Sequence, residues 1–166
     1  SDLLEYYEDA YLLFSVPEFT RSLANNMRSA SKVYAVDPAM FGAFSPASAL
    51  DQGQRLETAV FNALRRRTPA VRIGSVCRLL IKEKSKSHEV DFVAGDALLM
   101  RAYSLIQVSV DMASEKTRER EIAALDASMA QFDLGESAIV TMDEQADIPC
   151  EHGAVHVVPA WKWLLA

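Results

Sequence analysis

The sequence contains only two cysteines, Cys77 and Cys150, which is too few for a fold built on a disulfide framework. It also lacks a long apolar run, because stretches such as 105–110 and 161–166 are far shorter than the roughly 20 residues of a membrane-spanning helix. The N-terminus does not have the basic and then apolar pattern of a signal peptide. These absences predict a globular protein of the reducing cytoplasm, with no membrane partner.

Glycine is also scarce, and the six glycines do not form the Walker motif that cradles phosphates. The chain is therefore not expected to bind ATP in that way. Serine, histidine and aspartate occur without the nucleophile-elbow pattern of hydrolases, which gives that chemistry little support.

Positive charge is in the minority, with 17 Lys and Arg against 23 Asp and Glu and a net charge of -6. Residues 51–90 are the exception, because they hold nine basic and four acidic residues. Basic groups that lie close together attract phosphates over about one Debye length, roughly 8–10 Å in physiological salt. This segment predicts nucleic acid as a partner, with a solvated helix end and a charged hairpin as the alternative. The candidate nucleic-acid-binding residues are Arg65, Arg66, Arg67, Lys82, Lys84 and Lys86.

Hydrophobic periodicity predicts an α/β fold with a mixed central sheet flanked by helices. Helices are expected at 2–11, from an N-cap at Asp51 to Arg67, and at 115–132, with a further helical turn after Pro159. Strands are expected at 12–16, 32–36, 71–81, 89–93, 105–110, 138–142 and 156–158, with a turn at Gly95 and Asp96. The crossover from 105–110 through the helix to 138–142 is expected to join parallel strands.

Three polar residues are candidates for a metal site. Glu57 lies beside the apolar stripe of its helix. On the strand 89–93, the period of two places Glu89 with Asp91 on one face, and Val90 with Phe92 on the other.

Gln107 interrupts the apolar run at 105–110. If these elements pack together, Glu57, Asp91 and Gln107 converge as hard oxygen ligands suited to Mg²⁺ or Mn²⁺. A solvated sheet edge would carry the same acids, so that alternative stays open.

Several segments together resemble a known family. They are 32–37 (KVYAVD), 56–64 (LETAVFNAL), 89–93 (EVDFV), 105–108 (LIQV), 117–121 (TRERE) and 158–165 (VPAWKWLL). They are similar to the domain that follows the AAA-type ATPase core in many uncharacterised prokaryotic ATPases, whose fold is like that of the PD-(D/E)XK nucleases. The resemblance implies a restriction-endonuclease-like domain at 37–166, the end of a winged-helix segment at 1–36, and an upstream ATPase core.

The resemblance also assigns roles to particular residues. Glu57 matches the acid of the first core helix, Asp91 matches the acid after the turn, and Gln107 matches the third position. Ser109 stands where the family pattern has a lysine that stabilises charge on the phosphate, and a serine hydroxyl carries no positive charge. Lys116, or Arg118, at the start of the next helix is the candidate replacement.

The leading hypothesis is therefore an accessory domain with a degenerate nuclease-like site, which binds nucleic acid or positions the ATPase on a partner. One alternative is an active Mg²⁺- or Mn²⁺-dependent nuclease with Glu57, Asp91, Gln107 and Lys116 as its catalytic residues. Another is a protein-binding module, because the segment 133–151 carries six acidic residues and no Lys or Arg.

Overall fold

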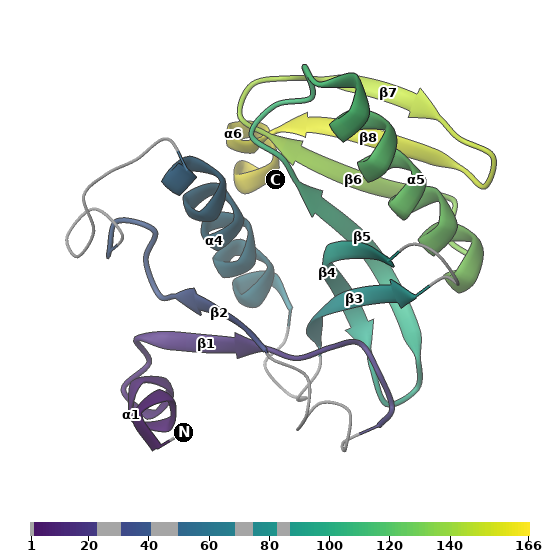
Figure 1. The fold of residues 1–166 in the computed structure, drawn as a ribbon. Coiled ribbons are helices and arrows are strands. Elements are labelled where there is room, and N and C mark those ends of the chain that lie inside the picture. Colours follow the sequence, from purple (N-terminus) through teal and green to yellow (C-terminus); the bar gives the residue numbers. More distant parts are fainter. Residues whose placement is uncertain (1, 23–30, 41–49, 69–74, 83–86) are drawn as a thin grey trace.

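The computed structural model describes residues 2–22, 31–40, 50–68, 75–82 and 87–166, and it shows a mixed six-stranded sheet flanked by helices (Figure 1). The helices are α1 (Asp2–Asp9), α4 (Leu50–Arg67), α5 (Glu115–Phe132) and α6 (Ala160–Leu165). The strands are β1 (Leu13–Val16), β2 (Lys32–Ala35), β3 (Val76–Lys82), β4 (Ser87–Asp96), β5 (Arg101–Val108), β6 (Glu136–Thr141), β7 (Ala146–Pro149) and β8 (Ala154–Pro159). The strand order is β3-β4-β5-β6-β8-β7, and β1 and β2 form a separate antiparallel pair.

Helix α4 covers one face of the sheet, and α6 lies on the same side (Figure 1). Val60 and Phe61 of α4 share a buried cluster with Phe92 of β4 and Ile106 of β5. The helix begins at Leu50, so Asp51 lies in its first turn and the expectation of an N-cap at Asp51 is wrong. An acid in the first turn is favoured by the helix dipole just as an acidic cap is, so composition alone does not separate the two positions.

Helix α5 covers the other face and has the predicted bounds, 115–132. The Ser114 hydroxyl caps it by accepting a hydrogen bond from the Thr117 backbone N–H. Leu125 and Met129 are fully buried in a cluster with Val93 and Leu105. The strands before and after this helix, β5 and β6, are parallel, which confirms the predicted crossover.

Strand β7 was not expected from the sequence. It pairs with β8 as the last strand of the sheet, and its four residues are exposed or half-buried. Because Ile148 is the half-buried apolar residue in an otherwise exposed strand, the alternation that marks a buried strand is absent.

The expectation of a turn at Gly95 and Asp96 is wrong, because both residues belong to β4. Gly95 pairs with Ala102 of β5 next to a shift in register. A Cβ atom at position 95 would lie 2.4 Å from the Arg101 carbonyl oxygen, so glycine permits a close approach of two strands here. The chain turns at residues 97–100 instead.

The N-terminal segment packs against the rest of the fold. Val16 of β1 and Tyr34 of β2 are buried in the cluster on the α4 side. After β1 the chain runs beside β3, where the Arg78 N–H donates to the Pro17 carbonyl and the Phe19 N–H donates to the Arg78 carbonyl. The domain boundary at residue 36 stays a prediction. In the parts of the chain that the structure describes, no helix has both the length and the apolar composition needed to cross a membrane.

The turn between β7 and β8 gives a test of the packing. We expect Gly153→Ala to lower the free energy of unfolding by about 1–3 kcal/mol, because the new Cβ atom would lie 2.2 Å from the Gly135 carbonyl oxygen. Gly135→Ala is the matched control, since its Cβ atom would meet nothing within 4 Å, and it should change stability by less than about 0.5 kcal/mol. Urea denaturation of both variants is the measurement, and equal stabilities would contradict the expectation.

Candidate functional site

A β-bulge in β4 sets the direction of Asp91. Between the pairs Cys77–Val93 and Leu79–Val90, β4 has one residue more than β3, so Asp91 and Phe92 together lie opposite Arg78. Such an extra residue bends a strand and redirects its side chains. As a result Val90 belongs to the buried cluster on the α5 side and Phe92 to the cluster on the α4 side. The sequence-based expectation that Val90 and Phe92 share a face is therefore wrong.

Strands β4 and β5 separate directly beside Asp91. Their pairing ends at Phe92 and Ile106, and side chains replace the strand-to-strand hydrogen bonds from there on. The Asp91 N–H donates to Gln107 Oε1 at 3.1 Å, and the Val108 N–H donates to Asp91 Oδ2 at 3.0 Å. Asp91 and Gln107 are each only 7% exposed. These polar side chains are thus held in place by the backbone groups that the separating strands leave unpaired.

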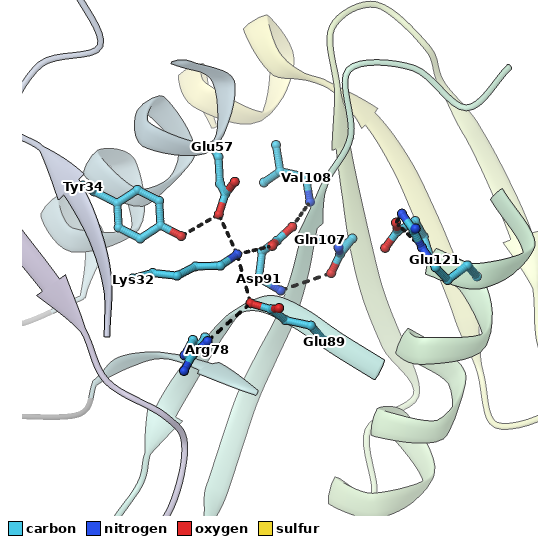
Figure 2. Close-up of polar contacts among 10 residues, drawn as sticks. Lys32, Tyr34, Glu57, Arg78, Glu89, Asp91, Gln107, Val108 and Glu121 are labelled. Atoms are coloured by element: carbon cyan, nitrogen blue, oxygen red, sulfur yellow. Dashed lines mark hydrogen bonds and ion pairs between the residues drawn. The ribbon is translucent and has the colours of Figure 1, made fainter. Parts of the chain in front are cut away.

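Two residues of β2 and one of α4 complete the cluster (Figure 2). Lys32 Nζ lies 3.0 Å from Glu57 Oε1, 3.0 Å from Glu89 Oε1 and 2.9 Å from Asp91 Oδ1. The Tyr34 hydroxyl donates to Glu57 Oε1 at 2.6 Å. Because β2 alternates sides with a period of two, Lys32 and Tyr34 reach the same carboxylate.

Burial and charge change the acidity of this cluster. Burial, together with the nearby charge of Glu57, raises the pKa of Asp91 to about 6, although Lys32 and the Val108 N–H favour the ionised form. Burial alone would lower the pKa of Lys32, but the charges of Asp91 and Glu57 outweigh it and raise that pKa above its usual value. Burial and Glu57 likewise raise the pKa of Tyr34, so its hydroxyl stays protonated and remains a donor.

The donor set fits a divalent cation such as Mg²⁺ or Mn²⁺. The carboxylates of Glu57 and Asp91 and the amide oxygen of Gln107 are hard oxygen ligands. Lys32 contacts one oxygen of each carboxylate. Three carboxylates, those of Glu57, Glu89 and Asp91, surround one ammonium group, and the cluster keeps a net negative charge even with Arg78 3.9 Å from Glu89.

A hollow of about 320 Å³ opens beside the cluster, on the α5 side of the sheet. Its lining combines side chains of the cluster with residues of α5 and the start of β4. They are His88, Glu89, Asp91, Gln107, Arg120, Glu121 and Ala124.

The structure brings together Glu57, Asp91 and Gln107, as their positions in the sequence suggested. It does not bring Lys116 or Arg118 to them, because both are exposed in the first turn of α5 and neither is among the residues that line the hollow. Ser109 follows β5, and its hydroxyl donates to the Asp111 carbonyl at 2.7 Å. The ammonium group at the cluster comes from Lys32 instead.

The three arginines predicted to bind nucleic acid lie at the end of α4, away from this cluster. Arg65, Arg66 and Arg67 are exposed at the end of α4. The Arg65 guanidinium lies 3.5 Å from the centre of the Phe14 ring, and Arg67 donates to the Trp163 carbonyl at 2.7 Å. Lys82 is the last residue of β3, while Lys84 and Lys86 lie outside the described residues.

Lys32 and Tyr34 were missed as site residues. The signal was present, since a lysine and a tyrosine alternate with apolar residues in a short strand and so point to one side. The sequence alone does not indicate which element the face of β2 with Lys32 and Tyr34 packs against. Nothing in the sequence distinguishes Arg120 and Glu121 from the other charged residues at the start of this helix.

Comparison with known proteins identifies one distant relative. The chain is 33% identical over 169 aligned residues, which cover 98% of its length, to the uncharacterized protein MJ1544 of Methanocaldococcus jannaschii. The chain spans about a third (35%) of the length of that relative. No family model and no solved structure matches the chain.

The raised pKa of Asp91 predicts a particular dependence of stability on pH. The unfolded chain loses this proton near pH 4, whereas the folded protein keeps it to about pH 6, so between these values the folded state binds more protons and stability falls as pH rises. Relative to Asp91→Asn, the wild-type free energy of unfolding should therefore fall by on the order of 2–3 kcal/mol from pH 4 to pH 7.

Urea denaturation across this pH range is the measurement. Asp143→Asn, a change at an exposed carboxylate, is the control for loss of one acid. A difference between wild type and Asp91→Asn that stays constant with pH would contradict the assignment.

Proposed function

We propose that the chain is a Mg²⁺- or Mn²⁺-dependent phosphodiesterase that acts on nucleic acid. The observation that carries the proposal is the position of Lys32, whose Nζ lies within 3.0 Å of the carboxylates of Glu57, Glu89 and Asp91. In the sequence pattern of the nuclease-like family a lysine provides the positive charge of the site, and Ser109 stands at that position in this chain. Lys32 supplies that charge from another strand.

Each residue then has a definite role. Glu57, Asp91 and Gln107 would hold the cation, which when bound supplies a Lewis acid for a phosphate oxygen and lowers the pKa of a bound water. Lys32 places a fixed positive charge where negative charge develops on the phosphate. Tyr34 donates to Glu57 and keeps that carboxylate oriented toward Asp91.

The broader family assignment is part of the same proposal. A restriction-endonuclease-like fold at 37–166, the end of a winged-helix segment at 1–36 and a place after an AAA-type ATPase core are what the sequence resemblance implies. The order helix, three strands, helix, strand from α4 onward is consistent with such a fold. The greater length of the relative leaves room for a further domain. A cytoplasmic location also belongs to this proposal.

A degenerate, non-catalytic site that binds nucleic acid is the second candidate. It is favoured by the same ion cluster, because the Lys32 ammonium group already neutralises part of the carboxylate charge without a metal. The protein-binding alternative, based on the acidic segment 133–151, stays a prediction.

Cleavage of oligonucleotides separates the two candidates. We expect Mn²⁺-dependent cleavage by the wild-type chain and a loss of about 100-fold or more in Lys32→Met and in Asp91→Asn. The first change removes the positive charge at the reacting phosphate, and the second removes a charged ligand of the cation. Lys116→Met is the matched control and should retain activity within about twofold, since Lys116 is exposed and away from the hollow.

Single-stranded, duplex and branched DNA are the substrates, and circular dichroism checks that each variant folds. An absence of cleavage in the wild type would favour the non-catalytic candidate. Loss of activity in Lys116→Met with activity retained in Lys32→Met would contradict the role of Lys32.

A further inference from the structure

The hollow beside the cluster has two unlike walls. One wall carries the buried acid and amide of the cluster, Asp91 and Gln107, and the other is the helix α5. Figure 2 shows Glu121 of α5 across from Gln107. Ala124, one turn further along α5, has a small side chain and leaves space between helix and sheet. A group that enters this hollow therefore contacts the cluster and α5 together.

Glu121 is a charged residue that is only 6% exposed, so it needs a partner. That partner is its neighbour Arg120, whose Nε and Nη2 both donate to Glu121 Oε1, at 3.1 and 2.5 Å. The Arg120 side chain itself is 65% exposed. The buried carboxylate thus fixes an exposed guanidinium at the hollow.

A guanidinium held in this way is suited to a phosphate. Arginine has five N–H donors in a planar fork, and the contacts to Glu121 use one N–H each of Nε and Nη2. The remaining donors, those of Nη1 among them, suit a second acceptor such as a phosphate oxygen. A polyanion needs a cationic contact such as this guanidinium in order to approach, because the net negative charge of the cluster repels it.

The size of the hollow limits the form of the substrate. About 320 Å³ is at the lower end of the roughly 300–1,000 Å³ of small-molecule pockets. A space of this size between a strand and a helix admits a single nucleotide unit of a strand and does not enclose a double helix.

We propose that Arg120 binds a backbone phosphate of a single nucleic-acid strand in this hollow, with Glu121 as the positioning residue for its guanidinium. The inference rests on the proposed function, because it assumes that the strand enters the hollow to reach Asp91. It adds the substrate class, a single strand, and a recognition residue that neither the sequence patterns nor the basic residues of α4 indicated.

Binding of a fluorescein-labelled single-stranded DNA, followed by anisotropy without divalent cation at several salt concentrations, is the first test. We expect Arg120→Ala to weaken binding about tenfold and to reduce the slope of log K against log salt by about 0.7, the value for one lost phosphate contact on a single strand. Duplex DNA of the same sequence should bind more weakly than the single strand.

Arg118→Ala is the matched control. Arg118 is exposed on the same helix and carries the same charge, but it lines a different hollow with Glu144 and Ile148. We expect the Arg118→Ala variant to bind the single strand with an affinity within about twofold of that of the wild type. Because Arg120→Ala leaves Glu121 without its partner, the double variant Arg120→Ala with Glu121→Gln is measured as well, and it should show the same tenfold loss even if the single variant unfolds.

Kinetics with Mn²⁺ separate this inference from the proposed function. Arg120→Ala should raise KM with little change in kcat, which is the pattern of a lost binding contact. Equal losses for Arg118→Ala and Arg120→Ala, or a wild-type chain that does not bind the single strand, would overturn the inference. Binding that depends on Arg120 without any cleavage would support the inference and reject the phosphodiesterase.

Discussion

The ion cluster of Lys32 with Glu57, Glu89 and Asp91 is the interaction on which the site depends. Glu57 and Asp91 come from a helix and a strand that are packed together by apolar side chains, so their carboxylates are brought close while most water is removed. Burial disfavours the ionised form of Asp91 and the charge of Glu57 repels it, and the raised pKa of Asp91 expresses both costs. The compensating charge comes from β2. The N-terminal hairpin is therefore bound to the rest of the fold by charge as well as by the burial of Val16 and Tyr34.

A second constraint is the separation of β4 from β5. A strand that leaves its neighbour exposes backbone N–H groups, and buried N–H groups need acceptors. The side chains of Gln107 and Asp91 provide these acceptors. Gln107 of β5 accepts from the Asp91 N–H of β4, and Asp91 accepts from the Val108 N–H of β5. The polar residues at the centre of the fold thus have a structural role and a chemical one, and the separation of the strands is also what gives the hollow access to Asp91. Stability and site chemistry are linked here through the same two side chains.

The sequence predicted what local patterns determine. The bounds of α5 follow from a serine cap and a helical apolar stripe, both within a few residues, and the gathering of Glu57, Asp91 and Gln107 follows once α4 and the two strands pack together. The bulge at Asp91 depends on how many residues β3 places opposite it, and that number is not visible in β4 alone. Lys32 meets acids that lie 25 and 59 residues further along the chain. A contact of that separation is fixed by the tertiary arrangement, so local sequence patterns indicate Lys116 of the next helix and not Lys32.

The two sides of the cluster are not equivalent, and this difference favours one direction of approach. On the α4 side, the Tyr34 ring stacks on Phe61 with 4.7 Å between centroids and lies 5.4 Å from Phe92, so aromatic rings fill the space behind Glu57. On the α5 side, small and polar side chains leave the hollow that reaches Asp91. Among the described residues, Arg120 lines this hollow with an exposed side chain, whereas Lys32 does not line it and contacts Asp91 at 2.9 Å. An anion that enters between sheet and helix therefore meets the Arg120 guanidinium in the hollow, while the Lys32 ammonium group offsets part of the carboxylate charge through its contacts to Asp91 and Glu89.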